Sequence, residues 1–224
     1  MFAARIQDIR EKLEALRQKP GTADWFGANQ HRFLLNPPLP EGEVAAFETR
    51  HSISLPEDYR QFLLLAGNGG VGPYDGLDPL SRWDEWFEEE GESPGYAASP
   101  CPFVYERMTS AAWPDYLPSD FADWGRGSIH ICDQGCTFAA RLVVSGQSRG
   151  RIFNFDAQRA VNVSGRKSRG GPVAFGAQQG PFPLYFVKDA NFINWYERWV
   201  DQALAGKPDN WFGYDNPDYS ALGL

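Results

Sequence analysis

The chain has 224 residues, of which 15% are aromatic and 22% are charged, and its formal net charge is −8. This length allows a self-sufficient core, and this composition excludes an intrinsically disordered chain. No window approaches 18 consecutive apolar residues and the N-terminus lacks the apolar core of a signal peptide, so we expect a cytoplasmic protein that makes no membrane contact.

The charge is distributed unevenly along the chain. Eight acids and one base lie in residues 75–92, whereas seven bases and one acid lie in residues 141–170. The acidic segment should repel nucleic acid and attract basic partners through long-range steering. The alternative is a solvated charge run that only keeps the protein soluble. The sequence leaves open whether the basic stretch binds anything.

The first predicted element is a helix that ends at Pro20-Gly21, because apolar residues recur at spacings of three and four. These residues are Phe2, Ile6, Ile9, Leu13 and Leu16. We interpret residues 1–20 as an N-terminal helical extension. A linker with the sequence NPPLP follows, and the next helix begins at about Glu41.

The stretch LPEDYRQFLLLAGNGGVGPY contains the pattern G-x-G-x-x-G at Gly67, Gly69 and Gly72. Pro56 fits the first position of a helix, where its missing N–H costs nothing, and Gly67 is expected to close that helix in the left-handed conformation. A dinucleotide-binding loop needs a strand before its glycines and a helix after them. Because a helix precedes the glycines and Pro73 follows them, we expect no cofactor here.

The apolar pattern changes to a period of two near residue 128. The segment GSIHICDQGC places Ile129 and Ile131 on one face of a strand and His130 and Cys132 on the other. TFAARLVVSG and RIFNF continue as strands divided by short turns, which predicts an antiparallel meander. We therefore predict an α+β fold in which helices pack against a mainly antiparallel sheet.

The C-terminal part predicts one more helix. Residues 161–180, rich in Gly, Ser and Arg, indicate an irregular excursion. Asp189 then fits the N-cap of a strongly apolar helix that ends before Gly206 and Pro208. The aromatic tail, residues 205–224, is expected to dock on the body. Without repeats or a sharp composition break, we predict a single domain over residues 1–224.

Catalytic and metal-binding patterns are weak. His130, Cys132 and Cys136, with Cys101, are candidate metal ligands, but the spacing C-x-x-x-C matches no common zinc knuckle. No serine lies in a G-x-S-x-G elbow, and a Cys132–His130 pair lacks a third group to orient the base. We therefore predict no metal, no catalytic residues and a protein that is not an enzyme.

Aromatic and acidic residues are mixed in the acidic segment. Protein interfaces use such mixtures, because aromatic anchors supply binding energy and a charged rim supplies orientation. We predict that the partner is bound by Tyr74, Asp75, Asp78, Trp83, Asp84, Glu85, Trp86, Glu88 and Glu89. The alternative for Trp83 and Phe87, which stand at i and i+4, is that they are core residues of a short helix.

These segments, taken in order, resemble the SUKH superfamily of Knr/Smi-like immunity proteins. The resemblance is carried by LPEDYRQFLLLAGNGGVGPYDGL, GSIHICDQGC, RLVVSGQSRGRIFNFD and FINWYERWVDQAL. It covers about residues 41–204, leaving the first helix and the tail as additions. It implies an α+β fold with helices on one mainly antiparallel sheet.

The resemblance also implies a function. Such proteins are typically encoded beside polymorphic toxins, including nucleases, which they bind and neutralise without catalysis. We therefore expect a cognate toxin with a basic surface as the partner, since a nuclease site that holds phosphates is cationic. A regulatory scaffold of the same fold is the alternative, and a small hydrolase using the Cys132 region is a third hypothesis.

Overall fold

The computed structural model describes residues 2–22, 25, 27–89, 95–108, 118, 122–160, 183–207 and 212–214, with the backbone alone for residues 86–89 and 122. The excursion expected at residues 161–180 lies outside the described residues. Within the described ranges, no helix has the length and apolar character that crossing a membrane requires.

An antiparallel sheet of four strands, in the spatial order β1-β2-β3-β4, forms the centre of the fold. The strands are β1 (Ser128–Asp133), β2 (Phe138–Val143), β3 (Ile152–Asp156) and β4 (Leu184–Phe186). Each strand pairs with the next one along the chain, so the predicted meander and the α+β fold are confirmed.

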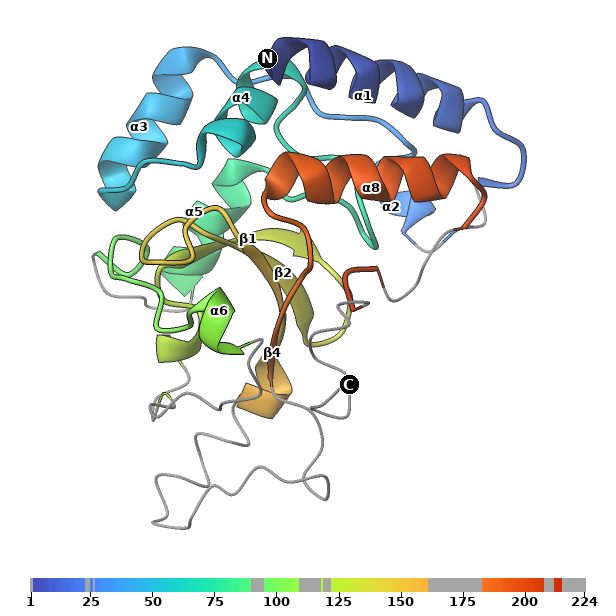
Figure 1. Cartoon of the computed structure of the whole chain (residues 1–224). Coiled ribbons are helices and arrows are strands. Elements are labelled where there is room, and N and C mark those ends of the chain that lie inside the picture. The colour runs from blue at the N-terminus through green and yellow to red at the C-terminus, as the bar shows by residue number, and fades with distance from the viewer. Residues whose placement is uncertain are drawn as a thin grey trace, which may run out of the picture.

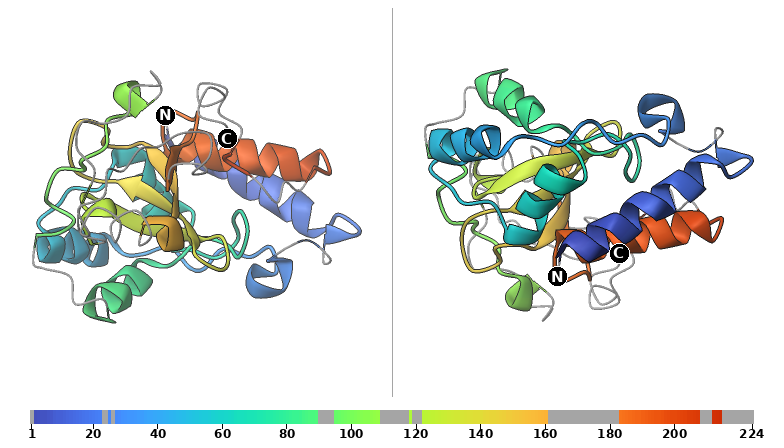
Figure 2. Two further views of the ribbon diagram at one scale, coloured as in Figure 1. Left: turned by 90° about the horizontal axis from the view of Figure 1, so that it is seen from below. Right: turned by 90° about the horizontal axis from the view of Figure 1, so that it is seen from above.

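Helices cover the sheet (Figure 1). In chain order they are α1 (Phe2–Arg17), α2 (Ala28–His31), α3 (Glu41–His51), α4 (Glu57–Leu65), α5 (Leu80–Glu89), α6 (Tyr105–Met108), the short 3-10 helix η2 (Ala122–Trp124) and α8 (Phe192–Leu204). Helices α1 and α8 lie side by side, as both views of Figure 2 show.

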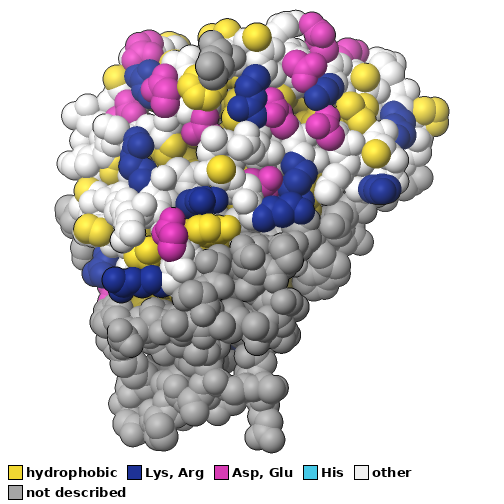
Figure 3. Space-filling view, viewed as in Figure 1, with side chains coloured by type: hydrophobic (Ala, Val, Ile, Leu, Met, Phe, Trp, Pro, Cys, Tyr) yellow, Lys and Arg dark blue, Asp and Glu magenta, His cyan; other side chains and the backbone are white. Residues whose placement is uncertain are grey.

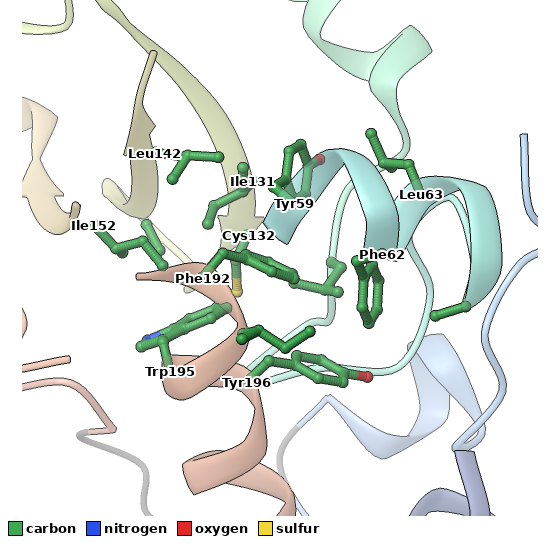
Figure 4. Close-up of a cluster of buried hydrophobic side chains, with 14 of the residues drawn as sticks. Tyr59, Phe62, Leu63, Ile131, Cys132, Leu142, Ile152, Phe192, Trp195 and Tyr196 are labelled. Carbon is green, nitrogen blue, oxygen red and sulfur yellow. The ribbon is translucent and has the colours of Figure 1, made fainter. Parts of the chain in front are cut away.

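The largest core lies between these helices and the sheet. Tyr59 and Phe62 of α4 pack against Phe192 and Tyr196 of α8, with ring centroids 4.7 Å apart for Tyr59–Phe192 and 4.9 Å apart for Phe62–Tyr196. Figure 4 shows these rings facing apolar side chains of β1 to β3. Aromatic pairs in such edge-on geometry add to the free energy of burial, so α4 and α8 are joined firmly through the core.

The first helix belongs to this core. Its predicted apolar stripe is buried at Ile6, Ile9, Leu13 and Leu16. The guanidinium of Arg5 pairs with the Glu197 carboxylate of α8, and it donates to the Asn194 side chain at 2.7 Å. Ion pairs Lys12–Asp8 and Lys12–Asp201 continue this seam, and Figure 3 shows charges of both signs interspersed on the face seen in Figure 1.

The opposite face of the sheet buries a second apolar cluster. Phe153 and Phe155 of β3 and Phe186 of β4 belong to it, together with Phe103 and Trp124 from the segments before the sheet. Because both faces are covered, all but the last residue of β1 are buried, and the strands do not alternate between buried and exposed residues.

One predicted strand face is wrong. Cys132 was expected beside His130, yet it lies in the helix-facing core with Ile129 and Ile131 (Figure 4). The register of β1 against β2 shifts between His130 and Cys132. A bulge adds one residue to a strand, so every later side chain changes face.

Two helix ends also differ from expectation. The N-cap of α8 is Asn191, whose side chain accepts from the Asn194 N–H at 3.0 Å, whereas Asp189 pairs with Arg198. Helix α4 ends at Leu65, and Gly67 has no positive φ; the left-handed glycines are Gly69 and Gly70. Gly67 is required for another reason, because a Cβ there would collide with the Asn36 carbonyl oxygen.

Candidate partner-binding site

The first half of the predicted partner-binding segment is a loop that extends the sheet beyond β1. Leu77 forms an isolated bridge with Cys132 of β1 and another with Gly70. The Asp78 N–H donates to the Ile131 carbonyl at 3.0 Å, and the Asp75 N–H donates to the Asp133 carbonyl at 3.3 Å. The loop is therefore fixed to the strand by its backbone, and Asp75 is brought beside Asp133.

Two buried histidines hold two of the predicted acids. His130 Nδ1 lies 2.6 Å from an oxygen of Asp78, and His51 Nε2 lies 2.6 Å from an oxygen of Asp84. Arg50 also pairs with Asp84. Both imidazoles are buried, so these carboxylates are positioned from inside the protein.

Asp75 and Asp133 are held differently. Among the described residues neither one forms an ion pair with a base. Burial, and then the nearby negative charges of Asp133 and Asp78, raise the pKa of Asp75 above its usual value. We call Asp75, Asp78 and Asp133 the acidic surface. It joins part of the predicted segment to the end of β1. The backbone contacts between the two hold the three carboxylates near one another.

Asp133 was missed in the sequence analysis. It stands 58 positions after Asp75, and the pairing of the acidic loop with the end of β1 brings the two acids together. The available signal was its position at the end of a predicted strand, in the turn DQGC, because an acid at that position lies at an end of the sheet.

Trp83 does not project into solvent. It is 3% exposed and lies in the main core, where its ring stacks on Tyr96 at 6.3 Å. Of the two interpretations of its spacing, the structure places it in the core. Glu85 is exposed and pairs with Arg82. The side chains of Trp86, Glu88 and Glu89 lie outside the described residues, although their backbone continues α5.

Tyr74 stands at the start of the acidic loop in an unusual conformation. Its φ is +52°, in the left-handed region that residues with a side chain adopt rarely. Its hydroxyl donates to the carbonyl oxygen of Phe212 at 2.9 Å. The predicted residue thus contacts the C-terminal segment, which sequence spacing did not indicate.

Residues 38–169, more than half of the chain, match the SMI1/KNR4 family (SUKH-1). The chain belongs to this family. Comparison with curated proteins and with solved structures gave no match. The matched region runs from before α3 to beyond β3, so the SUKH-1 match contains the acidic surface and leaves α1 and α8 outside. Domains of this family are generally non-catalytic, with immunity or regulatory roles.

Three arginines of the basic stretch contact other parts of this SUKH-1 chain. Arg141 is 7% exposed and donates to Ser128 Oγ at 2.9 Å. Arg149 donates to the carbonyls of Ser54 and Leu55, and the Arg151 guanidinium lies 3.9 Å from the centre of the Tyr105 ring. These three arginines therefore join parts of the SUKH-1 fold. Of the other four bases of the stretch, Arg159 follows β3, and those at residues 166–169 lie outside the described residues.

Two of the three cysteines of the SUKH-1 chain, Cys101 and Cys132, are buried thiols with raised pKa values. Burial raises the pKa of Cys132 well above its usual value, and it raises the pKa of Cys101 to about 11. Cys136 is exposed in the turn after β1. A nucleophilic cysteine needs a lowered pKa and access to substrate, and Cys132 has neither. Within the described residues no three His, Cys, Asp or Glu side chains group to hold a metal ion.

Proposed function

We propose that this SUKH-1 protein is a non-catalytic binding module of the immunity type, whose partner is a cognate toxin with a basic surface. The acidic surface carries the proposal. Asp75 lies beside Asp133 and Asp78 with no ion-pair partner among the described residues, and its raised pKa indicates that the folded protein disfavours its charge. Such unfavourable electrostatics are typical of functional positions, where the missing counter-charge comes from a ligand.

The internal pairs support the same proposal. Asp78 and Asp84 are held by His130 and His51, so the loop and α5 keep their place without the partner. A preformed surface loses less conformational entropy when it binds. Asp75 and Asp133 then supply the charge that steers a basic partner into contact.

A nuclease toxin fits this chemistry well. Its active site binds phosphates and is therefore cationic, so an acidic protein competes with the nucleic acid for the same surface. Inhibition then requires occlusion alone, which agrees with a family that is generally non-catalytic and with the buried, protonated thiol of Cys132.

The test is the association rate with the toxin encoded beside the gene. The double variant Asp75→Asn/Asp133→Asn should slow association by about tenfold at low salt and flatten its salt dependence, because steering depends on charge. The double variant Glu11→Gln/Glu57→Gln removes the same charge from exposed helical positions and is the matched control. Equal association rates for the two double variants would refute the role of the acidic surface.

A regulatory scaffold is the second candidate, because the same family includes regulatory domains. A rescue assay separates the two functions. An immunity protein restores growth of cells that express the neighbouring toxin, and Asp75→Asn/Asp133→Asn weakens that rescue. A scaffold gives no rescue and instead forms a complex with a non-toxic protein.

A further inference from the structure

The described C-terminal residues 212–214, here called the strap, pack into the fold. Phe212 is 1% exposed; its ring centre lies 5.8 Å from that of Trp195 and 4.3 Å from the guanidinium of Arg198. Tyr214 stacks on Tyr185 of β4, with ring centroids 5.6 Å apart. The strap appears as a short red segment in Figure 1. It is therefore a docked part of the protein.

The strap is tied to the acidic loop at one end. Its Phe212 carbonyl accepts the hydrogen bond from the Tyr74 hydroxyl, and Asp75 is the next residue. The Tyr74 carbonyl also packs against Gly27, where any Cβ would collide with it. A left-handed conformation is unfavourable for tyrosine, so contacts around Tyr74 must hold it there. The bond to Phe212 is one of those contacts.

The strap is tied to the end of β1 at its other end. The Tyr214 hydroxyl donates to Gln134 Oε1 at 3.1 Å, and Gln134 follows Asp133 directly. The Gln134 side-chain amide donates in turn to Asn154 Oδ1 at 2.6 Å. One three-residue segment thus contacts the immediate neighbours of Asp75 and of Asp133, the two acids that have no ion-pair partner in the described part of the chain.

Two buried hydrogen-bond donors beside the docked strap lack an acceptor among the described residues. The side-chain amide of Asn154, beside Gly213, and the indole N–H of Trp195, beside Phe212, are buried, and neither finds an acceptor in the part of the chain that the structure describes. Buried donors without acceptors oppose the docked state. Among the described contacts, these two donors count against the docked state, whereas the rings of Phe212 and Tyr214 favour it.

We propose that the strap is a conformational control of the acidic surface, and that docking of residues 212–214 stabilises the backbone bonds that hold Asp75 beside Asp133. When the strap leaves, Tyr74 loses the bond that supports its left-handed conformation and the acidic loop relaxes. The coupling concerns the free protein and holds whatever the partner is. Where the proposed function also holds, a partner that binds the ordered surface tightens the strap by the same factor by which the strap tightens the partner.

Hydrogen exchange of the full chain tests this coupling without a partner. The readout is the exchange of the Asp75 and Asp78 amides, which donate to β1, and of the Gly135 amide, which donates to the Asp133 carboxylate at 2.8 Å. Tyr74→Phe removes only the hydroxyl and should raise the exchange rates of these amides about threefold to tenfold. Phe212→Ala removes the anchor of the strap and should accelerate them by more than tenfold.

Phe103→Ala is the matched control, because Phe103 is also 1% exposed but lies in the cluster on the other face of the sheet. It should not accelerate the three amides selectively. The proposal is overturned if Phe212→Ala speeds exchange at residues 212–214 and leaves the three amides as protected as in the parent protein. If Phe212→Ala unfolds the whole chain, Tyr74→Phe decides alone, and unchanged exchange in that variant overturns the proposal.

Discussion

The guanidinium of Arg141 lies 5.3 Å from the centre of the Trp83 ring, and this contact joins β2 to the helix of the acidic segment. Arg141 is buried, and its guanidinium donates to Ser128 and to the Gly125 carbonyl. No carboxylate of the described residues pairs with it. The aromatic face and the surrounding oxygens therefore stabilise the buried cation.

Replacing Arg141 tests this contact. Arg141→Lys keeps the charge but loses the planar guanidinium, and should lower the free energy of unfolding by about 1–3 kcal/mol, because a lysine cannot keep the ring contact and the bonds to Ser128 together. Urea unfolding measures the change. Arg82→Lys, at an exposed position in α5, should change it by less than about 0.5 kcal/mol. Similar values for both variants would contradict the role of Arg141.

Removing the charge of Asp75 should stabilise the protein, in contrast to the replacement of Arg141. Because its pKa is raised in the folded state, the ionised carboxylate is less favourable there than in the unfolded chain. Asp75→Asn should therefore raise the free energy of unfolding at pH 7 by less than about 1 kcal/mol, since the site is partly solvated, and thermal unfolding measures the change. The gain should vanish at pH values well below 3.8, where the carboxyl is protonated in both states. A gain that persists in acid would point to another cause.

His31 makes stability sensitive to mild acid. Burial lowers its pKa from 6.5 to about 4, and its Nδ1 accepts the Phe33 N–H at 3.0 Å. Between these two pKa values the unfolded chain binds a proton that the folded protein does not, so stability falls as the pH drops from 6.5 toward 4, by about 3 kcal/mol in total.

Unfolding curves recorded across this range check the prediction. His31→Asn keeps an acceptor for the Phe33 N–H but does not titrate, so its stability should fall less steeply between pH 6.5 and 4. Identical slopes for the parent protein and the variant would show that other groups dominate the acid response.

Two glycines should respond to alanine in opposite directions. Gly67→Ala places a Cβ against the Asn36 carbonyl and should cost about 1–3 kcal/mol, because backbone atoms cannot move aside cheaply. Gly42 lies in α3 with nothing near its Cβ position, so Gly42→Ala should stabilise the protein by about 0.5–1 kcal/mol. Thermal unfolding of both variants decides, and a stabilising Gly67→Ala would mean that the contact with Asn36 is relaxed in solution.

The first helix should be essential to stability although it lies outside the family match. Ile9 is fully buried, so Ile9→Ala should cost about 2–5 kcal/mol. Gln7→Ala, at an exposed position of the same helix, should cost less than about 0.5 kcal/mol. Denaturant unfolding compares the two, and a small loss for Ile9→Ala would show that α1 docks weakly.

The sequence predicted the elements whose periodicity is local. The stripes of α1, α4 and α8 follow from spacings of three and four, and the meander follows from its turns. The alternating pattern could not predict which face of β1 carries Cys132, because a bulge depends on how two strands pair. The sequence analysis named Asp189 as the cap of α8. The true cap is Asn191, which also suits that position, and the contact of Asp189 with Arg198 is invisible to a local pattern.

The candidate site was predictable in part. Composition indicated the acidic segment, and the resemblance indicated the fold that presents it. The contacts of Tyr74 with Phe212 and of Asp75 with Asp133 join residues distant in sequence, so no local pattern contains them. The sequence analysis offered the core position of Trp83 as one of two interpretations, and the contacts that favour it, with Tyr96 and Arg141, come from other parts of the chain.

The packing of α1 on α8 has a consequence for which helices related chains can lose. Both helices lie outside the matched family region, and each buries apolar side chains that would otherwise face water. A chain that lost one of them would expose the apolar face of the other. Relatives that carry an equivalent of α8 should therefore also carry an equivalent of α1, or have polar residues on the face of α8 that α1 covers here.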